Sequence, residues 1–187
     1  MGKIKGSKIL LDLLKLLTFQ VGNEVSLSEL AMHLSLDGKT VSRYLDLLEK
    51  TFIIIRLGGF SRNLRSEITN KSKYYFLDNG VRNGVISQFN TLDSRNDIGQ
   101  LWENFVVVER MKKRIYKHIY GQSYFWRTYE QQEIDLIEEK DGRLFTYECK
   151  WLPKRKNVHA PKIWTEIYPD HSAFEVITSE NYLDFVA

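Results

Sequence analysis

The segment that most constrains the fold is residues 131–151, which read QQEIDLIEEKDGRLFTYECKW. The dipeptide Asp141-Gly142 is a strong turn signal, and apolar and polar residues alternate on both sides of it. This pattern predicts a β-hairpin whose two-residue turn is closed by Lys140 and Arg143. Counting outward from the turn then predicts three further cross-strand pairs: Ile137 with Thr146, Asp135 with Glu148, and Glu133 with Lys150.

This register gives the hairpin two chemically different faces, because side chains two residues apart on a strand share a face. One face is expected to gather the polar residues Glu133, Asp135, Thr146, Glu148 and Lys150. The other is expected to carry the apolar residues Ile134, Leu136, Phe145, Tyr147 and Cys149, which suit burial.

The opposed carboxylates Asp135 and Glu148 allow two interpretations. Directly opposed carboxylates, with Cβ atoms about 5 Å apart, repel each other in a bare sheet. A divalent cation such as Mg²⁺ or Mn²⁺ would remove this repulsion, because hard ions take oxygen ligands and often use one or two carboxylates. The alternative is an ordinary solvated face on which Glu133 and Lys150 form an ion pair. On the hairpin alone, the solvated face is slightly favoured.

The order Asp135, then Glu148-Cys149-Lys150, resembles the Asp…(Glu/Asp)-x-Lys signature of the PD-(D/E)xK nuclease superfamily. In that superfamily a further glutamate often comes from a preceding helix, and the segment LWENFV at residues 101–106 offers Glu103. The resemblance implies a catalytic site in which Asp135 and Glu148 bind Mg²⁺ or Mn²⁺ and Glu103 assists. Lys150 would position the attacking water or stabilise the developing charge.

A narrower resemblance follows from the ordered series LWENFV, FWRT, EID and ECK over residues 100–151. The series is similar to the C-terminal domain that follows the ATPase core in a family of prokaryotic AAA-type ATPases. Residues 41–50 and 73–80 resemble the winged-helix region of the same family and its exit. The resemblance spans roughly residues 20–180 but does not include the ATPase core, which leaves either a fragment of a longer protein or a protein without the motor.

A nucleotide-binding loop is not expected, although residues 37–40 (DGKT) contain the Gly-Lys-Thr of a Walker A motif. That motif needs a glycine five positions before its second glycine, and His33 stands there. The segment also lies between two expected helices, with no strand leading into it. ATP hydrolysis is therefore not carried over from the resemblance.

The first third of the chain predicts a winged helix-turn-helix. Its expected order is three helices, over residues 7–20, 26–33 and 38–50, and then strands at 52–57 and 73–77. Four basic residues are candidates for contact with nucleic acid: Lys39 and Arg43 on the third helix, and Arg62 and Arg65 in the loop between the strands. A packing or dimerisation module is the alternative, because winged helices serve that role as well.

A second domain is expected at residues 98–187, after a winged-helix domain at 1–80 and a linker at 81–97 that is rich in Asn, Ser and Gly. Around the hairpin, the expected elements are a helix at 98–117, a strand at 123–128, a helix at 159–168 and a strand at 173–178. This order predicts an α/β sandwich of the restriction-endonuclease type. Arg127 could contact a phosphate or pair with Glu130 or Glu133.

Composition favours nucleic acid as the partner. The net charge is only +3, but the basic residues gather in three clusters, at 56–73, 110–117 and 150–156. The apolar run at residues 9–17 is too short to cross a membrane. Cys149, the single cysteine, excludes an internal disulfide, is expected to be an inert core residue and fits a cytoplasmic protein.

The leading hypothesis is a protein that acts on nucleic acid, DNA in the first place, through metal-assisted hydrolysis of a phosphodiester. The rival is a non-catalytic module that binds DNA or protein, as an accessory to an ATPase supplied elsewhere. A transcriptional regulator is a third hypothesis, but it leaves the grouping of Glu103, Asp135, Glu148 and Lys150 unexplained.

Overall fold

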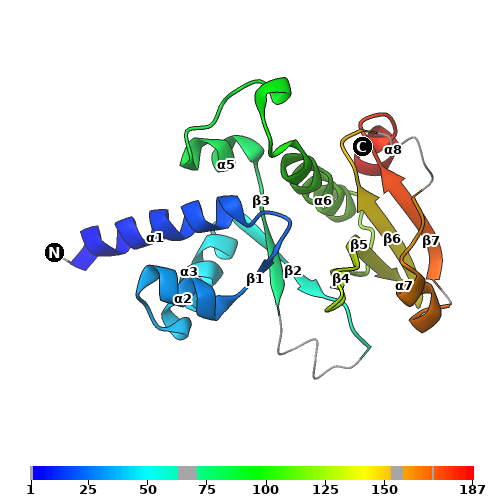
Figure 1. Ribbon diagram of the computed structural model, residues 1–187, viewed down its shortest axis with the longest axis horizontal. Helices are drawn as coiled ribbons and strands as arrows, with labels where there is room; N and C mark the ends of the chain where they lie inside the picture. Colours follow the sequence, from blue (N-terminus) through cyan, green and yellow to red (C-terminus); the bar gives the residue numbers. More distant parts are fainter. Residues whose placement is uncertain (1, 63–70, 153–157, 170) are drawn as a thin grey trace. The chain divides into compact units, whose positions relative to one another are not determined.

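The computed structural model describes residues 2–62, 71–152, 158–169 and 171–187. Over these residues the protein is mixed α+β, with seven α-helices and a seven-stranded mixed sheet in the order β1-β3-β2-β4-β5-β6-β7 (Figure 1). The chain divides into two compact units, one of residues 1–56 and 71–95 and the other of residues 57–70 and 96–187. The division falls within strand β2 (Ile54–Gly59).

The first unit contains the predicted three helices and two strands. The elements are α1 (Gly2–Phe19), α2 (Leu27–Leu34), α3 (Gly38–Lys50), β2 and β3 (Ser72–Phe76). The structure adds a short strand β1 (Glu24–Val25), which pairs antiparallel with β3. Strand β1 was not expected, because two residues are too few to show an alternating pattern.

Local capping sets the start of the two helices α2 and α3. The Ser26 hydroxyl accepts a hydrogen bond from the Glu29 amide at 3.3 Å, as the capping-box pattern predicts. Asp37 Oδ1 accepts from the Thr40 amide at 2.9 Å in the same way at α3. The apolar side of α3 (Val41, Leu45 and Leu48) is buried, and Tyr44 is half-buried.

Residues 81–97 differ from the expected linker. Helix α5 (Asn79–Val85) occupies the beginning of this stretch, and a 3₁₀ turn (Leu92–Ser94) lies near its end. Arg82 is buried and donates from Nη2 to the Thr18 carbonyl oxygen at 3.0 Å, so α5 is packed against α1. The Asn- and Gly-rich composition therefore reflects a short helix and its turns, and this stretch belongs to the first unit as far as Arg95.

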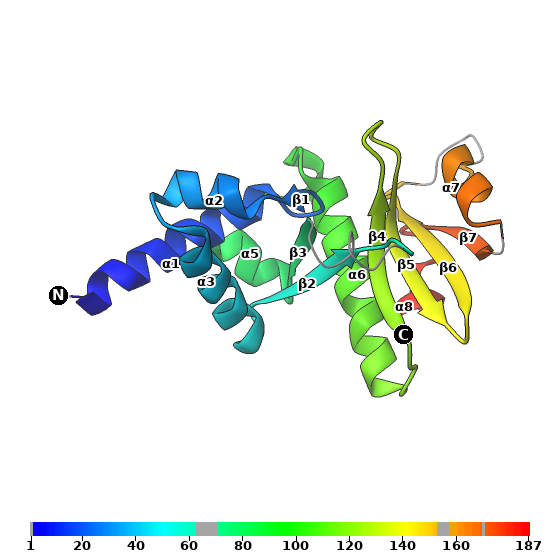
Figure 2. The same cartoon turned by 90° about the horizontal axis from the view of Figure 1, so that it is seen from below.

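The second unit has the predicted order of helix, three strands, helix and strand. Its elements are α6 (Ile98–Tyr116), β4 (Gln122–Arg127), β5 (Glu133–Lys140), β6 (Arg143–Cys149), α7 (Lys162–Ile167), β7 (His171–Ile177) and a final helix α8 (Tyr182–Val186). Strands β4, β5 and β6 are antiparallel, and β7 runs parallel to β6 (Figure 2). Helix α8 was not expected, because five residues carry no helical periodicity.

The β5–β6 hairpin has the predicted register. Lys140 pairs with Arg143 and Ile137 with Thr146, and both turn residues have positive φ, 51° at Asp141 and 73° at Gly142. Two central residues with positive φ make a type I′ turn, whose twist matches that of the strands. The regular pairs end at Leu136 and Tyr147, so Asp135 and Glu148 follow directly after the last pair.

The predicted division of the hairpin into faces is wrong at Ile134. Tyr124 and Trp126 of β4 pair with Ile137 and Ile134 of β5, so β5 carries one extra residue in a bulge. Because the bulge shifts the alternation, Ile134 packs in the same core cluster as Ile137, around Trp164 of α7. Tyr147, which was expected on the face of Ile134, instead packs in a tilted arrangement against Phe185 of α8, with ring centroids 4.6 Å apart.

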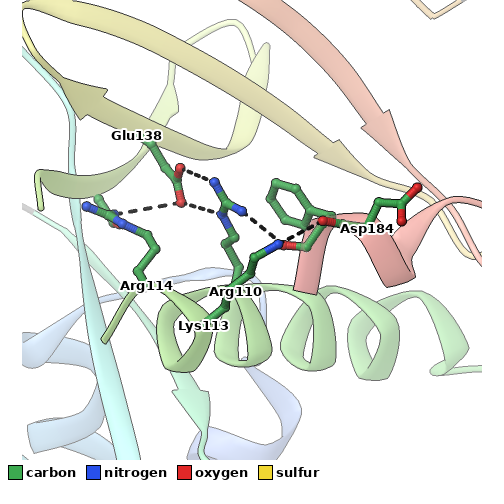
Figure 3. A network of polar contacts seen from close by, with 7 residues as sticks. Arg110, Lys113, Arg114, Glu138 and Asp184 are labelled. Carbon is green, nitrogen blue, oxygen red and sulfur yellow. Dashed lines mark hydrogen bonds and ion pairs between the residues drawn. The ribbon is translucent and has the colours of Figure 1, made fainter. Parts of the chain in front are cut away.

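A buried ion pair joins α6 and α8 to β5 (Figure 3). Arg110 binds Glu138 through two hydrogen bonds of 2.9 and 2.8 Å, and its Nη1 donates to the Phe185 carbonyl oxygen at 3.0 Å. Arg114 lies 3.7 Å from the same carboxylate. Glu138 is only 5% exposed, so its negative charge is stabilised by these two arginines and not by water.

We expect Glu138→Ala to lower the free energy of unfolding by about 3–5 kcal/mol, because it leaves the buried guanidinium of Arg110 without its carboxylate. The matched control is Asp46→Ala, which removes a carboxylate from the exposed pair with Lys50 and should change stability by less than about 1 kcal/mol. Urea unfolding of both variants checks this. Equal losses in the two variants would contradict the structural role given to Glu138.

Candidate functional site

The two candidate carboxylates lie at the end of the hairpin opposite its turn. Asp135 is buried, with 3% exposure, and its Oδ2 accepts a hydrogen bond of 2.8 Å from the Cys149 amide. This bond connects the beginning of β5 to the end of β6, beyond the last regular backbone pair. It holds Asp135 beside the segment that carries Glu148 and Lys150.

Lys150 is bound to Glu148 rather than to Glu133. Lys150 Nζ lies 2.6 Å from Glu148 Oε1. Glu133 lies instead opposite Arg127 of β4, with Arg127 Nε 3.6 Å from Glu133 Oε2. The solvated face with a Glu133–Lys150 pair is therefore not the arrangement found.

The charged groups of the site act on one another. Burial raises the pKa of Glu148, the nearby charge of Asp135 raises it further, and the hydrogen bond from Lys150 only partly offsets these effects. Burial alone would lower the pKa of Lys150, but the hydrogen bond to Glu148 and the charges of Glu148, Asp135 and Glu103 outweigh it and raise the pKa. Lys150 is therefore held in its protonated form.

Helix α6 brings Glu103 to this group. The neighbouring Trp102 is buried, and its indole Nε1 donates to the Ile177 carbonyl oxygen at 3.2 Å. The Lys150 amide donates to the same oxygen at 2.9 Å, so the first turns of α6 are anchored at the backbone of Lys150. This hydrogen bond depends on β7, which is distant in the chain, so no sequence signal could have predicted the anchoring role of Trp102.

The donor set fits a hard cation held by a pair of carboxylates. Within residues 2–62, 71–152, 158–169 and 171–187, no group of three or more His, Cys, Asp or Glu side chains has the arrangement of a metal site. Mg²⁺ commonly uses one or two protein carboxylates and completes its shell with water. Asp135 and Glu148 suit that mode. The negative charge of Glu103 helps to raise the pKa of Lys150 beside them.

The candidate nucleic-acid contacts are divided between the two units. Lys39 and Arg43 are exposed on α3 of the first unit. In the second unit, Arg62 is exposed beside the ring of Tyr168, at 5.6 Å from the ring centroid, and Arg127 hydrogen-bonds the side chain of Gln131. The predicted contact at Arg65 lies outside the described residues.

Two family models match the chain, and each covers slightly less than half of it. The model of a domain of unknown function, DUF8612, matches residues 1–92. The model of a second domain of unknown function, DUF4143, matches residues 98–185. The two matches meet close to the boundary at Arg95 that the compact units show.

Several curated proteins are similar over most of this chain. An uncharacterized protein of Mycobacterium tuberculosis is 29% identical over 131 residues, which is 69% of this chain and 29% of that protein. An uncharacterized protein of Haemophilus influenzae is 27% identical over 142 residues, 73% of this chain and 32% of that protein. The chain thus spans about a third of the length of the curated relatives it matches, and no solved structure matches it significantly.

Across the described part of the chain, no helix combines the length and the apolar character needed to cross a bilayer.

We expect Asp135→Asn to lower the pKa of Glu148, because the variant removes a neighbouring negative charge. Lys150→Ala should have the opposite effect and raise the same pKa, because it removes the hydrogen bond and the positive charge. A pH titration of the Glu148 carboxyl carbon by NMR measures both shifts. Shifts of the same sign in the two variants would show that the three groups are not coupled as the structure has them.

Proposed function

We propose that the second unit is a metal-dependent phosphodiesterase domain that acts on nucleic acid, with DNA as the expected substrate. The observation that carries the proposal is the group formed by Asp135, Glu148 and Lys150, in which two acids and a protonated lysine interact at one end of the hairpin. Glu103 of α6 adds a third acid that acts on the same lysine.

The order of elements supports a PD-(D/E)xK-type fold for this unit. Helix α6, strands β4–β6, helix α7 and strand β7 follow one another in the order that the superfamily signature implies. Asp135 lies at the bulge of β5, and bulges often occur next to active sites, where they redirect a side chain.

In the proposed mechanism, Asp135 and Glu148 would hold Mg²⁺ or Mn²⁺. When bound, the ion supplies Lewis acidity and lowers the pKa of a coordinated water. Lys150 then donates hydrogen bonds and stabilises the negative charge that develops on the phosphate. It does not accept the proton of the water, because its raised pKa keeps it protonated at neutral pH.

For the first unit we propose a winged helix that contacts DNA. The order α1, β1, α2, α3, β2 and β3, with β1 paired to β3, supports this assignment. Helix α3 would be the recognition helix, and its exposed Lys39 and Arg43 would meet phosphates or base edges.

A second candidate is a non-catalytic accessory module that binds DNA or protein. It is favoured by the absence of a three-carboxylate metal group among the described residues, since many nucleases use more than two acids. The matched segments make up only 29% and 32% of the two relatives, which leaves room in them for a further domain such as the ATPase core that the sequence resemblance implies. In this case the group formed by Asp135, Glu148 and Lys150 would bind DNA or a protein partner without catalysing a reaction.

We expect Asp135→Ala to abolish Mg²⁺-dependent cleavage of DNA. Saturating Mn²⁺, at about 100 times its dissociation constant, should stabilise the wild type by about 2.7 kcal/mol, a rise in melting temperature of about 5–10 °C. The rise should vanish in Asp135→Ala. Glu139→Ala, at the turn end of the same strand, should keep both cleavage and the rise. Cleavage by Asp135→Ala at the wild-type rate would exclude the proposed site.

We expect the double variant Lys39→Ala, Arg43→Ala to bind duplex DNA more weakly and with less dependence on salt. Each phosphate contact contributes about 0.9 to the slope of log affinity against log salt, so the slope should fall by about 2. Fluorescence anisotropy over a salt series gives the slope. An unchanged slope would show that Lys39 and Arg43 of α3 do not contact DNA phosphates, and would favour a packing role for this helix.

A further inference from the structure

The connection between β4 and β5 presents a tyrosine to solvent beside the candidate site. Among the large apolar and aromatic side chains of the described residues, Tyr129 is the most exposed, at 101%, whereas the next, Tyr120, is 80% exposed. The connection projects from the ends of the two strands (Figure 2). Because its whole ring is in solvent, packing within the fold does not explain why a tyrosine stands at position 129.

The turn that carries Tyr129 is held by a dense set of hydrogen bonds. The Thr128 amide donates to the Gln132 carbonyl oxygen at 2.8 Å, and the Gln131 amide donates to the Thr128 carbonyl oxygen at 3.1 Å. The Gln132 amide also donates to the Thr128 hydroxyl at 3.2 Å. The Gln131 side chain accepts from Arg127 and donates to the Tyr129 carbonyl oxygen. The backbone that presents the ring is therefore fixed, although the ring touches nothing.

The same turn is connected to the carboxylates. Its two ends are the paired residues Arg127 and Glu133, which also form an ion pair. Glu133 is two residues before Asp135, a distance of about 7 Å along a strand. The base of the turn and Asp135 therefore lie on the same short stretch of β5, separated by one residue.

We propose that Tyr129 stacks on an unpaired nucleobase of the nucleic acid that occupies the candidate site. This inference rests on the proposed function, since it takes nucleic acid as the ligand. A flat ring on a fixed turn binds a base with little loss of conformational freedom, and stacking accepts any base because every base has a π-face. Tyr129 is thus a substrate-positioning residue that favours single-stranded regions over a continuous duplex.

The test measures binding of the full chain to a short fluorescein-labelled single-stranded DNA, in EDTA so that no cleavage occurs. Tyr129→Ala should weaken binding about tenfold, as loss of one stacked base predicts. Tyr129→Phe should bind within about twofold of the wild type, because the ring and not the hydroxyl makes the contact. In a strand containing 2-aminopurine, the fluorescence change on binding should be lost in Tyr129→Ala and kept in Tyr129→Phe.

Tyr120→Ala is the matched control, because Tyr120 is an exposed tyrosine at the other end of β4 and should bind as the wild type does. A blunt duplex should show no more than a small loss with Tyr129→Ala. The inference is overturned if the wild type does not bind single strands, or if Tyr129→Ala matches it. It also fails if Tyr129→Phe is as weak as Tyr129→Ala, or if the loss on the duplex is as large.

The outcome can be separated from that of the proposed catalysis. A wild type that shows the Tyr129 pattern in EDTA but cleaves nothing in Mn²⁺ would support base stacking by a non-catalytic module. A wild type that cleaves in Mn²⁺ but is insensitive to Tyr129→Ala would support the metal site alone.

Discussion

The hydrogen bond from the Cys149 amide to Asp135 Oδ2 is the contact on which the arrangement of the candidate site depends. Regular pairing between β5 and β6 ends at Leu136 and Tyr147, so the strands beyond this pair need another connection. The carboxylate of Asp135 supplies it, because its oxygen satisfies a backbone donor that is otherwise buried. One side chain thereby closes the end of the hairpin and, together with the pairing of β6 with β7, positions Glu148 and Lys150.

This dual role has an electrostatic consequence. Buried Asp135 and largely buried Glu148 share one lysine, so the group is short of positive charge. Burial raises the pKa of Glu148 and the charge of Asp135 raises it further, whereas the hydrogen bond to Glu148 and the nearby carboxylates outweigh burial and raise the pKa of Lys150. A cation would relieve the deficit, and so would a change in protonation of Glu148. Metal binding and protonation would therefore compete, with metal affinity falling as pH drops through the raised pKa of Glu148. The contrast with Glu138 is informative, because Arg110 and Arg114 fully balance that buried carboxylate and leave it a structural role.

Much of the fold could be predicted from patterns that are local in the chain. The turn at Asp141-Gly142 determined the register of the hairpin, and the helices expected over residues 26–33 and 38–50 begin within one residue of their predicted starts. The errors arose where structure depends on contacts distant in sequence. The bulge that moved Ile134 exists only through the pairing of β5 with β4, and α5 is helical where Arg82 can reach the Thr18 carbonyl oxygen.

The sequence by itself determined which acidic residues and which lysine could form a site, because the hairpin count placed Asp135 beside Glu148 and Lys150. Only the tertiary structure decided how they pair: Lys150 binds Glu148, Glu133 turns to Arg127, and α6 brings the charge of Glu103 to the lysine. The physical reason is the separation along the chain over which each kind of interaction acts. Turn chemistry and strand alternation act between residues close in the chain, whereas burial, the bulge and the charges of other elements act only after the chain has folded.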